Sequence, residues 1–187
     1  RNSKFFSDYL TEFHGDMQEL NLLLLARFFE FSPPMQVMIV NYLRLLPRSV
    51  PQERYCPILL KVMYAPETHG ETMIAVIRYF GKYKYDAAYE KLLEFLHMDS
   101  DMIKEFNYAA VAASSLRSYA SQKTIHSLLV ALNSTDWYVR FNCADSLLEL
   151  GVDYETVILS STDQYAKDIL IHRSEVYKLR KGAKFTL

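Results

Sequence analysis

Residues 136–151, DWYVRFNCADSLLELG, carry a complete helix signature. The polar residues 133–135 precede them and can accept hydrogen bonds from the free amides of a first turn, in which Asp136 suits the positive end of the helix dipole. One apolar stripe follows at spacings of four, four and three, formed by Val139, Cys143, Leu147 and Leu150, and a second lies beside it, formed by Phe141, Ala144 and Leu148. Gly151 stands where a left-handed C-terminal cap favours a residue without Cβ. The stretch predicts a helix covered on two sides.

Weaker copies of this pattern lie upstream. A shift of 35 positions aligns 105–109 with 140–144, Asp101 with Asp136 and Leu93 with Leu128. A shift of 70 aligns 77–81 with 147–151, so that Gly81 takes the place of Gly151. Periods of this size are typical of stacked helical hairpins, and we therefore expect a repeat protein.

Composition favours a helical fold. Of 187 residues, 50% are hydrophobic and 23% are charged, which excludes a disordered chain and allows a large core. Five Gly and six Pro indicate few tight turns, and long alternations of β-branched residues are absent. These features predict an all-α fold, and the repeats predict an α-solenoid of antiparallel helical hairpins.

Glycine and proline positions divide the chain into helices. We expect an N-terminal helix over 7–31 with a break at Gly15 and Asp16, and a helix over 52–64 with an internal irregularity at Pro57. The other expected helices cover 35–46, a segment ending at 80–81, 85–97, 100–119, 122–132, 136–150, 154–159 and 163–178. They form one predicted repeat domain, 1–187, with irregular helices in 1–64, the clearest repeats in 65–160, and a capping helix with a basic tail in 161–187.

Charge and cysteine usage bear on partners and location. A formal net charge of −1 argues against a general nucleic-acid binder. Cys56 and Cys143 lie in apolar helical patterns without metal or redox spacing, which favours buried free thiols in a reducing compartment, here the cytoplasm. No apolar run reaches about 18 residues, so no membrane span is expected in this chain. Arg1 and Lys4 beside two phenylalanines suit either an ordinary helix start or the flank of a membrane anchor upstream of Arg1.

The motif at 136–151 resembles the second helix of a HEAT repeat, in particular the short variety found in phycobilin lyase-like proteins. The matching positions are Asp136, Val139, Arg140, Ala144, Leu150 and Gly151. The resemblance covers about 64–159 with declining quality, because the upstream copies lack the Val-Arg pair. A tetratricopeptide array has a similar period, but its Trp, Gly and Tyr pattern is missing. The resemblance implies a helical scaffold, with a tetrapyrrole (bilin) lyase or isomerase as the alternative.

Signatures of catalysis are missing from the sequence. None of the five histidines is followed by Glu, the pair that iron-binding HEAT-type hydroxylases use, and neither a phosphate loop, a nucleophile elbow nor an HExxH motif is present. We therefore predict no enzyme and assign no catalytic residue, cofactor or metal ligand. For the bilin alternative, a pocket would have to come from tyrosines that more often belong to a helical core: Tyr83, Tyr85, Tyr89, Tyr108 and Tyr119.

In a stacked array, the second helices line one side, and their residues off the apolar stripe are available to a partner. These residues form the candidate protein-binding surface: Arg78, Asn107, Trp137, Tyr138, Arg140 and Asn142. Trp and Tyr contribute much of the energy at interfaces, although packing against the preceding repeat is the alternative role for Trp137 and Tyr138. We predict a non-catalytic protein-interaction scaffold whose partner the sequence does not name.

Each polar residue discussed here has two alternative roles, one in binding a partner and one within the fold. Arg140 can bind a carboxylate of the partner, or it can pair with Asp101 or Asp136 of the chain itself. Asn107 and Asn142 are equivalent under the 35-residue shift and form either a polar ladder or a recognition row.

Overall fold

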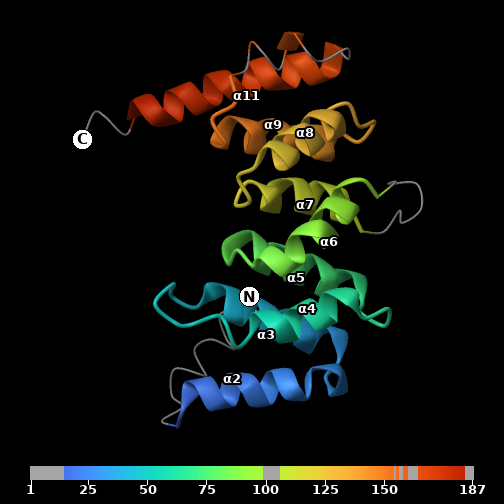
Figure 1. Ribbon diagram of the computed structural model, residues 1–187, viewed down its shortest axis with the longest axis vertical. Coiled ribbons are helices and arrows are strands. Elements are labelled where there is room, and N and C mark those ends of the chain that lie inside the picture. Colours follow the sequence, from blue (N-terminus) through green and yellow to red (C-terminus); the bar gives the residue numbers. More distant parts are fainter. Residues whose placement is uncertain (1–14, 99–105, 154, 156–157, 160–163, 184–187) are drawn as a thin grey trace. The chain divides into compact units, whose positions relative to one another are not determined.

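The computed structural model describes residues 15–98, 106–153, 155, 158–159 and 164–183. The regular elements in these ranges are nine α-helices and two short 3-10 turns, which confirms the predicted all-α class (Figure 1). No helix in the same ranges is both long and apolar enough to cross a membrane. The chain forms two compact units, 1–88 and 89–187.

The first unit consists of α2 (Met17–Ala26), η1 (Phe28–Glu30), α3 (Pro33–Leu45), α4 (Cys56–Tyr64), α5 (Gly70–Lys82) and η2 (Asp86–Ala88). α5 packs against both α3 and α4, and α2 packs against α4. The side chains of Val76, Ile77 and Phe80 on α5 are fully buried. α3 begins with Pro33 and Pro34, two residues before the predicted start at 35, because their fixed φ and missing amide suit a first turn.

Three predictions in the first unit are wrong in detail. The helix expected over 7–31 ends at Ala26, followed by the 3-10 turn that buries Phe28, whereas the expected break at Gly15 and Asp16 is confirmed by the cap Asp16 of α2; residues 7–14 lie outside the described ranges. Pro57 does not disturb a helix, since α4 begins at Cys56 and places Pro57 in its first turn. Gly81 does not end α5, which continues through Lys82 to a cap at Tyr83.

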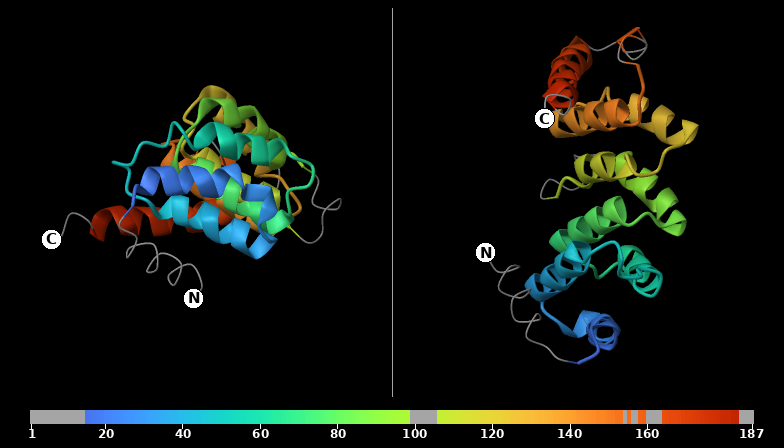
Figure 2. Two further views of the ribbon diagram at one scale, coloured as in Figure 1. Left: turned by 90° about the horizontal axis from the view of Figure 1, so that it is seen from below. Right: turned by 90° about the vertical axis from the view of Figure 1, so that its left-hand side faces the viewer.

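The second unit consists of α6 (Tyr89–Leu96), α7 (Tyr108–Leu116), α8 (Gln122–Ala131), α9 (Trp137–Glu149) and α11 (Gln164–Ala183). α9 lies between α7 and α11 and also packs against α8, as Figure 2 shows within this unit. The side chains of Val139, Cys143 and Leu147 on α9 are buried. The prediction that this helix is covered on two sides is confirmed.

Helix caps explain where the second unit differs from the prediction. The helix expected over 100–119 begins at Tyr108, after the cap Asn107, whose Oδ1 accepts a hydrogen bond from the amide of Ala110 at 2.9 Å; residues 99–105 lie outside the described ranges. In α9 the cap is Asp136 itself rather than a residue of 133–135. Gly151 has a φ of 80°, which confirms the predicted left-handed cap.

The C-terminal segment is also longer in helix than expected. α11 covers Gln164–Ala183 and continues beyond the predicted end at 178 into the basic segment. Residues 154, 156 and 157 of the helix predicted over 154–159 lie outside the described ranges. Cys56 and Cys143 are buried free thiols, as predicted.

Candidate partner-binding site between α9 and α11

The first turns of α9 face α11 across a cavity of about 450 Å³. It combines aromatic rings with charged side chains, from α9 (Trp137, Arg140 and Phe141) and from α11 (Tyr165, Asp168, Ile169, His172 and Arg173). Two residues of the sequence-predicted surface, Trp137 and Arg140, thus meet in one site.

Two exposed aromatic rings, Trp137 and Tyr165, line this cavity, and a third, Tyr138, contacts Trp137. Trp137 stacks on Phe141 with ring centroids 5.0 Å apart and meets Tyr138 edge to face at 5.1 Å. Nevertheless Trp137 is 50% exposed, Tyr138 62% and Tyr165 70%. Large rings that stay exposed beside a cavity are typical of a protein-interaction site.

An ion pair fixes α11 on α9. Arg173 donates from Nε and Nη2 to the two carboxylate oxygens of Asp145, at 2.5 and 2.7 Å, and both side chains are largely buried. The guanidinium carbon of Arg173 also lies 4.2 Å from the ring centroid of Phe141. This two-pronged pair and the cation–π contact hold one wall of the cavity in place without a partner.

Arg140 is held by the backbone and forms no ion pair with the other residues that the structure describes. Its Nη1 donates to the carbonyl oxygens of Ser134 and Thr135 at 2.7 and 3.0 Å, and its guanidinium carbon lies 5.7 Å from the ring centroid of Tyr165. Its Nε is buried and has no acceptor among the described residues. The pairing with Asp136 weighed from the sequence is wrong, and Asp101 lies outside the described ranges.

The carboxylate of Asp136 serves the fold instead. Its Oδ1 accepts hydrogen bonds from the amides of Tyr138 and Val139 at 2.7 and 3.0 Å, and its Oδ2 accepts one from Nδ2 of Asn107 at 2.9 Å. Asn107 therefore links the N-terminal caps of α7 and α9.

The remaining predicted residues lie apart from the cavity. Asn142 donates from Nδ2 to the carbonyl oxygen of Tyr138, one turn earlier in α9, at 2.9 Å. Asn107 is a cap and Asn142 lies inside a helix, so their equivalence under the 35-residue shift is wrong. Arg78 is exposed on α5, in the first unit.

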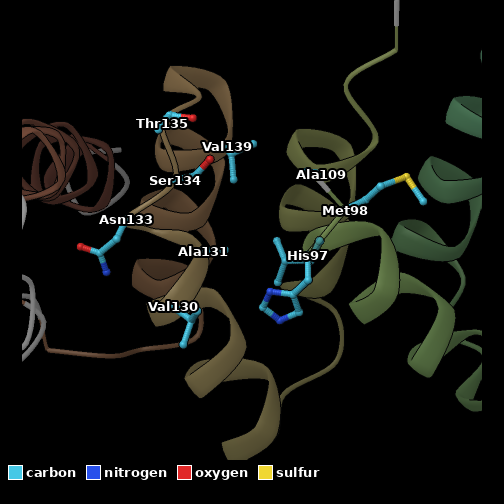
Figure 3. A pocket seen from close by; sticks show the side chains of 10 residues that line it. His97, Met98, Ala109, Val130, Ala131, Asn133, Ser134, Thr135 and Val139 are labelled. Atoms are coloured by element: carbon cyan, nitrogen blue, oxygen red, sulfur yellow. The ribbon is translucent and has the colours of Figure 1, made fainter. Parts of the chain in front are cut away.

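A second cavity of about 370 Å³ lies between the two hairpins of the second unit (Figure 3). His97, Met98 and Ala109 line one side, and the end of α8 with the turn into α9 lines the other: Val130, Ala131, Asn133, Ser134, Thr135 and Val139. Among the described residues, this cavity is lined by no aromatic ring other than the imidazole of His97 and by no arginine. The α9–α11 cavity therefore has the chemistry better suited to a partner.

The five tyrosines considered for a bilin pocket take part in packing and hydrogen bonding. Tyr83 donates to the carbonyl oxygen of Leu46 in the first unit, and in the second unit Tyr89 stacks on Tyr119 with ring centroids 5.6 Å apart. Tyr85 stacks on Phe80, and Tyr108 contacts Phe95. None of the five lines either cavity.

Comparisons with known proteins do not extend this picture. No protein-family model, curated protein or solved structure matches the chain. In the part of the chain that the structure describes, no three His, Cys, Asp or Glu residues are grouped closely enough to hold a metal ion.

Proposed function

We propose that the chain is a non-catalytic protein-interaction scaffold of HEAT-like helical hairpins, in the cytoplasm, which holds a partner protein at the α9–α11 site. The observation that carries this proposal is the exposure of Trp137 and Tyr165 in a cavity that Arg140 also lines, with the exposed ring of Tyr138 in contact with Trp137. Burying such rings against a partner removes apolar area from water, at about 25 cal/mol per Å².

Regular spacing supports the repeat architecture. The helices α5, α7 and α9 end at the caps Tyr83, Arg117 and Leu150, at intervals of 34 and 33 residues. α7 and α9 are also joined by equivalent parts: their N-caps bond to each other, and Oγ of the buried Ser146 donates to the carbonyl oxygen of Ala113 at 2.7 Å. Repeated contacts between successive second helices are what a helical solenoid requires.

The site is suited to binding because it is already formed. The Arg173–Asp145 pair and the stack of Trp137 on Phe141 order the walls before a partner arrives. A preorganised site loses less conformational entropy on binding, so more of the contact energy becomes affinity.

Site-specific photo-crosslinking in the cells that make the protein tests this proposal. A benzophenone amino acid replaces Tyr138 in one variant and Tyr64, which is 52% exposed on α4, in the control. We expect one protein to be captured from Tyr138, to be missing from Tyr64, and to be lost when Trp137→Ala is added. Equal capture at both positions, or none at Tyr138, contradicts the proposed site.

The tetrapyrrole alternative has weaker support. The tyrosines considered for a bilin pocket are engaged in packing. The aromatic rings and Arg140 of the α9–α11 cavity are nevertheless groups that a flat pigment with carboxylates could contact. Visible absorbance of a bilin that shifts on mixing with the chain, and that does not shift with Trp137→Ala, would favour this alternative over the scaffold.

A further inference from the structure

The first unit carries a cationic surface where the end of α3 meets α5. It consists of Arg44 on α3 with Arg78 and Lys82 on α5, two helices that pack against each other. α3 contains no acidic residue, and the acidic residue of α5, Glu71, lies in its first turn, far from Lys82 in the last. No carboxylate on these two helices therefore neutralises this end.

Lys82 makes hydrogen bonds that serve the fold, whereas the side chains of Arg44 and Arg78 form no hydrogen bond or ion pair with the other described residues. Nζ of Lys82 donates to the carbonyl oxygens of Arg44 and Leu46 at 2.6 and 3.1 Å, which caps the C-terminal end of α3. Nε of Arg44 is buried without an acceptor, and Arg78 is exposed and joins none of the ion pairs among the described residues. Burial lowers the pKa of Arg44, and the nearby charge of Arg78 lowers it further.

We propose that Arg44 and Arg78 bind a carboxylate-rich segment of a partner protein, a second contact that rests on the proposed scaffold function. A carboxylate placed beside the two guanidinium groups accepts hydrogen bonds from the exposed guanidinium of Arg78 and offsets the repulsion between the charges of Arg44 and Arg78. The planar guanidinium fork matches a carboxylate through two parallel hydrogen bonds, which a lysine cannot do.

The size of this surface favours an acidic protein segment over a polyanion. Nucleic-acid binders of the usual kind make about 6–10 phosphate contacts, and segments that bind anionic membranes carry about 4–8 basic residues. Here three cations stand together in a chain whose formal net charge is −1. A few carboxylates saturate such a surface.

Fluorescence anisotropy with a short fluorescein-labelled glutamate peptide tests the inference, with the glutamine peptide of equal length as the reference. We expect the complete chain to bind the first and not the second. Arg78→Glu removes an exposed side chain without disturbing a described contact, and it should weaken binding by about tenfold or more. Lys61→Glu is the matched control, because Lys61 is exposed on α4 and changes the net charge equally.

Several outcomes of this binding experiment would contradict the inference. Equal losses for Arg78→Glu and Lys61→Glu, unaltered binding by Arg78→Glu, or equal binding of the glutamine peptide overturns the inference. Binding restricted to a phosphorylated peptide, to oligonucleotides or to anionic vesicles overturns it in favour of a phosphate ligand. Trp137→Ala should leave glutamate-peptide binding unchanged, so that failure here is distinguishable from failure of the α9–α11 site.

Discussion

The carboxylate of Asp136 caps α9 and also accepts a hydrogen bond from Asn107. Its removal should therefore reveal a coupling free energy between the N-terminal caps of α7 and α9. Asp136→Ala deletes the cap of α9, at a cost of about 1 kcal/mol, and leaves the part-buried Nδ2 of Asn107 without its acceptor, at a further cost of about 1 kcal/mol. Asn107→Ala deletes the cap of α7 and the same shared hydrogen bond, so it also costs about 2 kcal/mol.

The double variant loses the shared hydrogen bond only once. It should therefore be destabilised by about 3 kcal/mol rather than about 4, a coupling free energy of about 1 kcal/mol between the two caps. Urea unfolding followed by far-ultraviolet circular dichroism measures all four proteins, with an unchanged slope required for the comparison. Additivity within about 0.3 kcal/mol would show that the caps of α7 and α9 do not interact and would refute the reasoning.

Further predictions concern single positions on and around α9. Leu147→Ala should destabilise by about 2–5 kcal/mol, because the side chain is 0% exposed; a loss well under about 1 kcal/mol in urea unfolding would contradict its place in the core. Gly151→Ala should cost about 1–2 kcal/mol in the same assay, because a Cβ meets nothing within 4 Å and only the left-handed backbone opposes it; an unchanged midpoint would contradict this reason. Burial raises the pKa of the Cys143 thiol, so as the pH rises the thiol ionises in the unfolded chain before it ionises in the folded chain. The free energy of unfolding should therefore fall above about pH 8.5, more steeply in the wild type than in Cys143→Ala. Parallel pH profiles of the two proteins would contradict this prediction.

The sequence predicted most closely the helix whose bounds are marked by nearby residues, α9. The two stripes of 136–150 and Gly151 located α9 almost to the residue, because burial of two faces leaves a periodic record and a left-handed cap favours glycine. The predicted effects of Pro57 and Gly81 were wrong because each effect depends on where the helix begins or ends, and tertiary packing decides those positions. The same proline is a defect inside a helix and neutral in its first turn.

Alignment by repeats failed where the repeats differ in length. α7 has nine residues and α9 has thirteen, and the difference falls at their N-terminal ends. Residues near the C-terminal caps therefore correspond, whereas Asn107 corresponds to Asp136 and not to Asn142. An alignment of apolar residues alone does not detect that α7 is shorter than α9. The N-capping side chains of Asn107 and Asp136 are the sequence signal that would have revealed it.

The candidate site was half predictable. Trp137 and Arg140 stood out by residue type, but Tyr165, His172 and Arg173 belong to α11, whose register on α9 is set by tertiary packing. The pair of Arg173 with Asp145 spans 28 positions and leaves no periodic trace in the sequence.

The most direct test of the scaffold function is a calorimetric titration of the purified crosslinked partner. It compares the wild type with a double variant, Trp137→Ala and Arg140→Gln, in which the glutamine removes the charge and keeps a polar side chain. We predict a rise in Kd of about 30-fold or more, or about 2 kcal/mol, with helicity retained, while a control with Tyr64→Ala and Arg54→Ala binds as the wild type does. A folded double variant with an unchanged Kd would contradict the account and place recognition elsewhere, with the basic segment 178–184 as the next candidate.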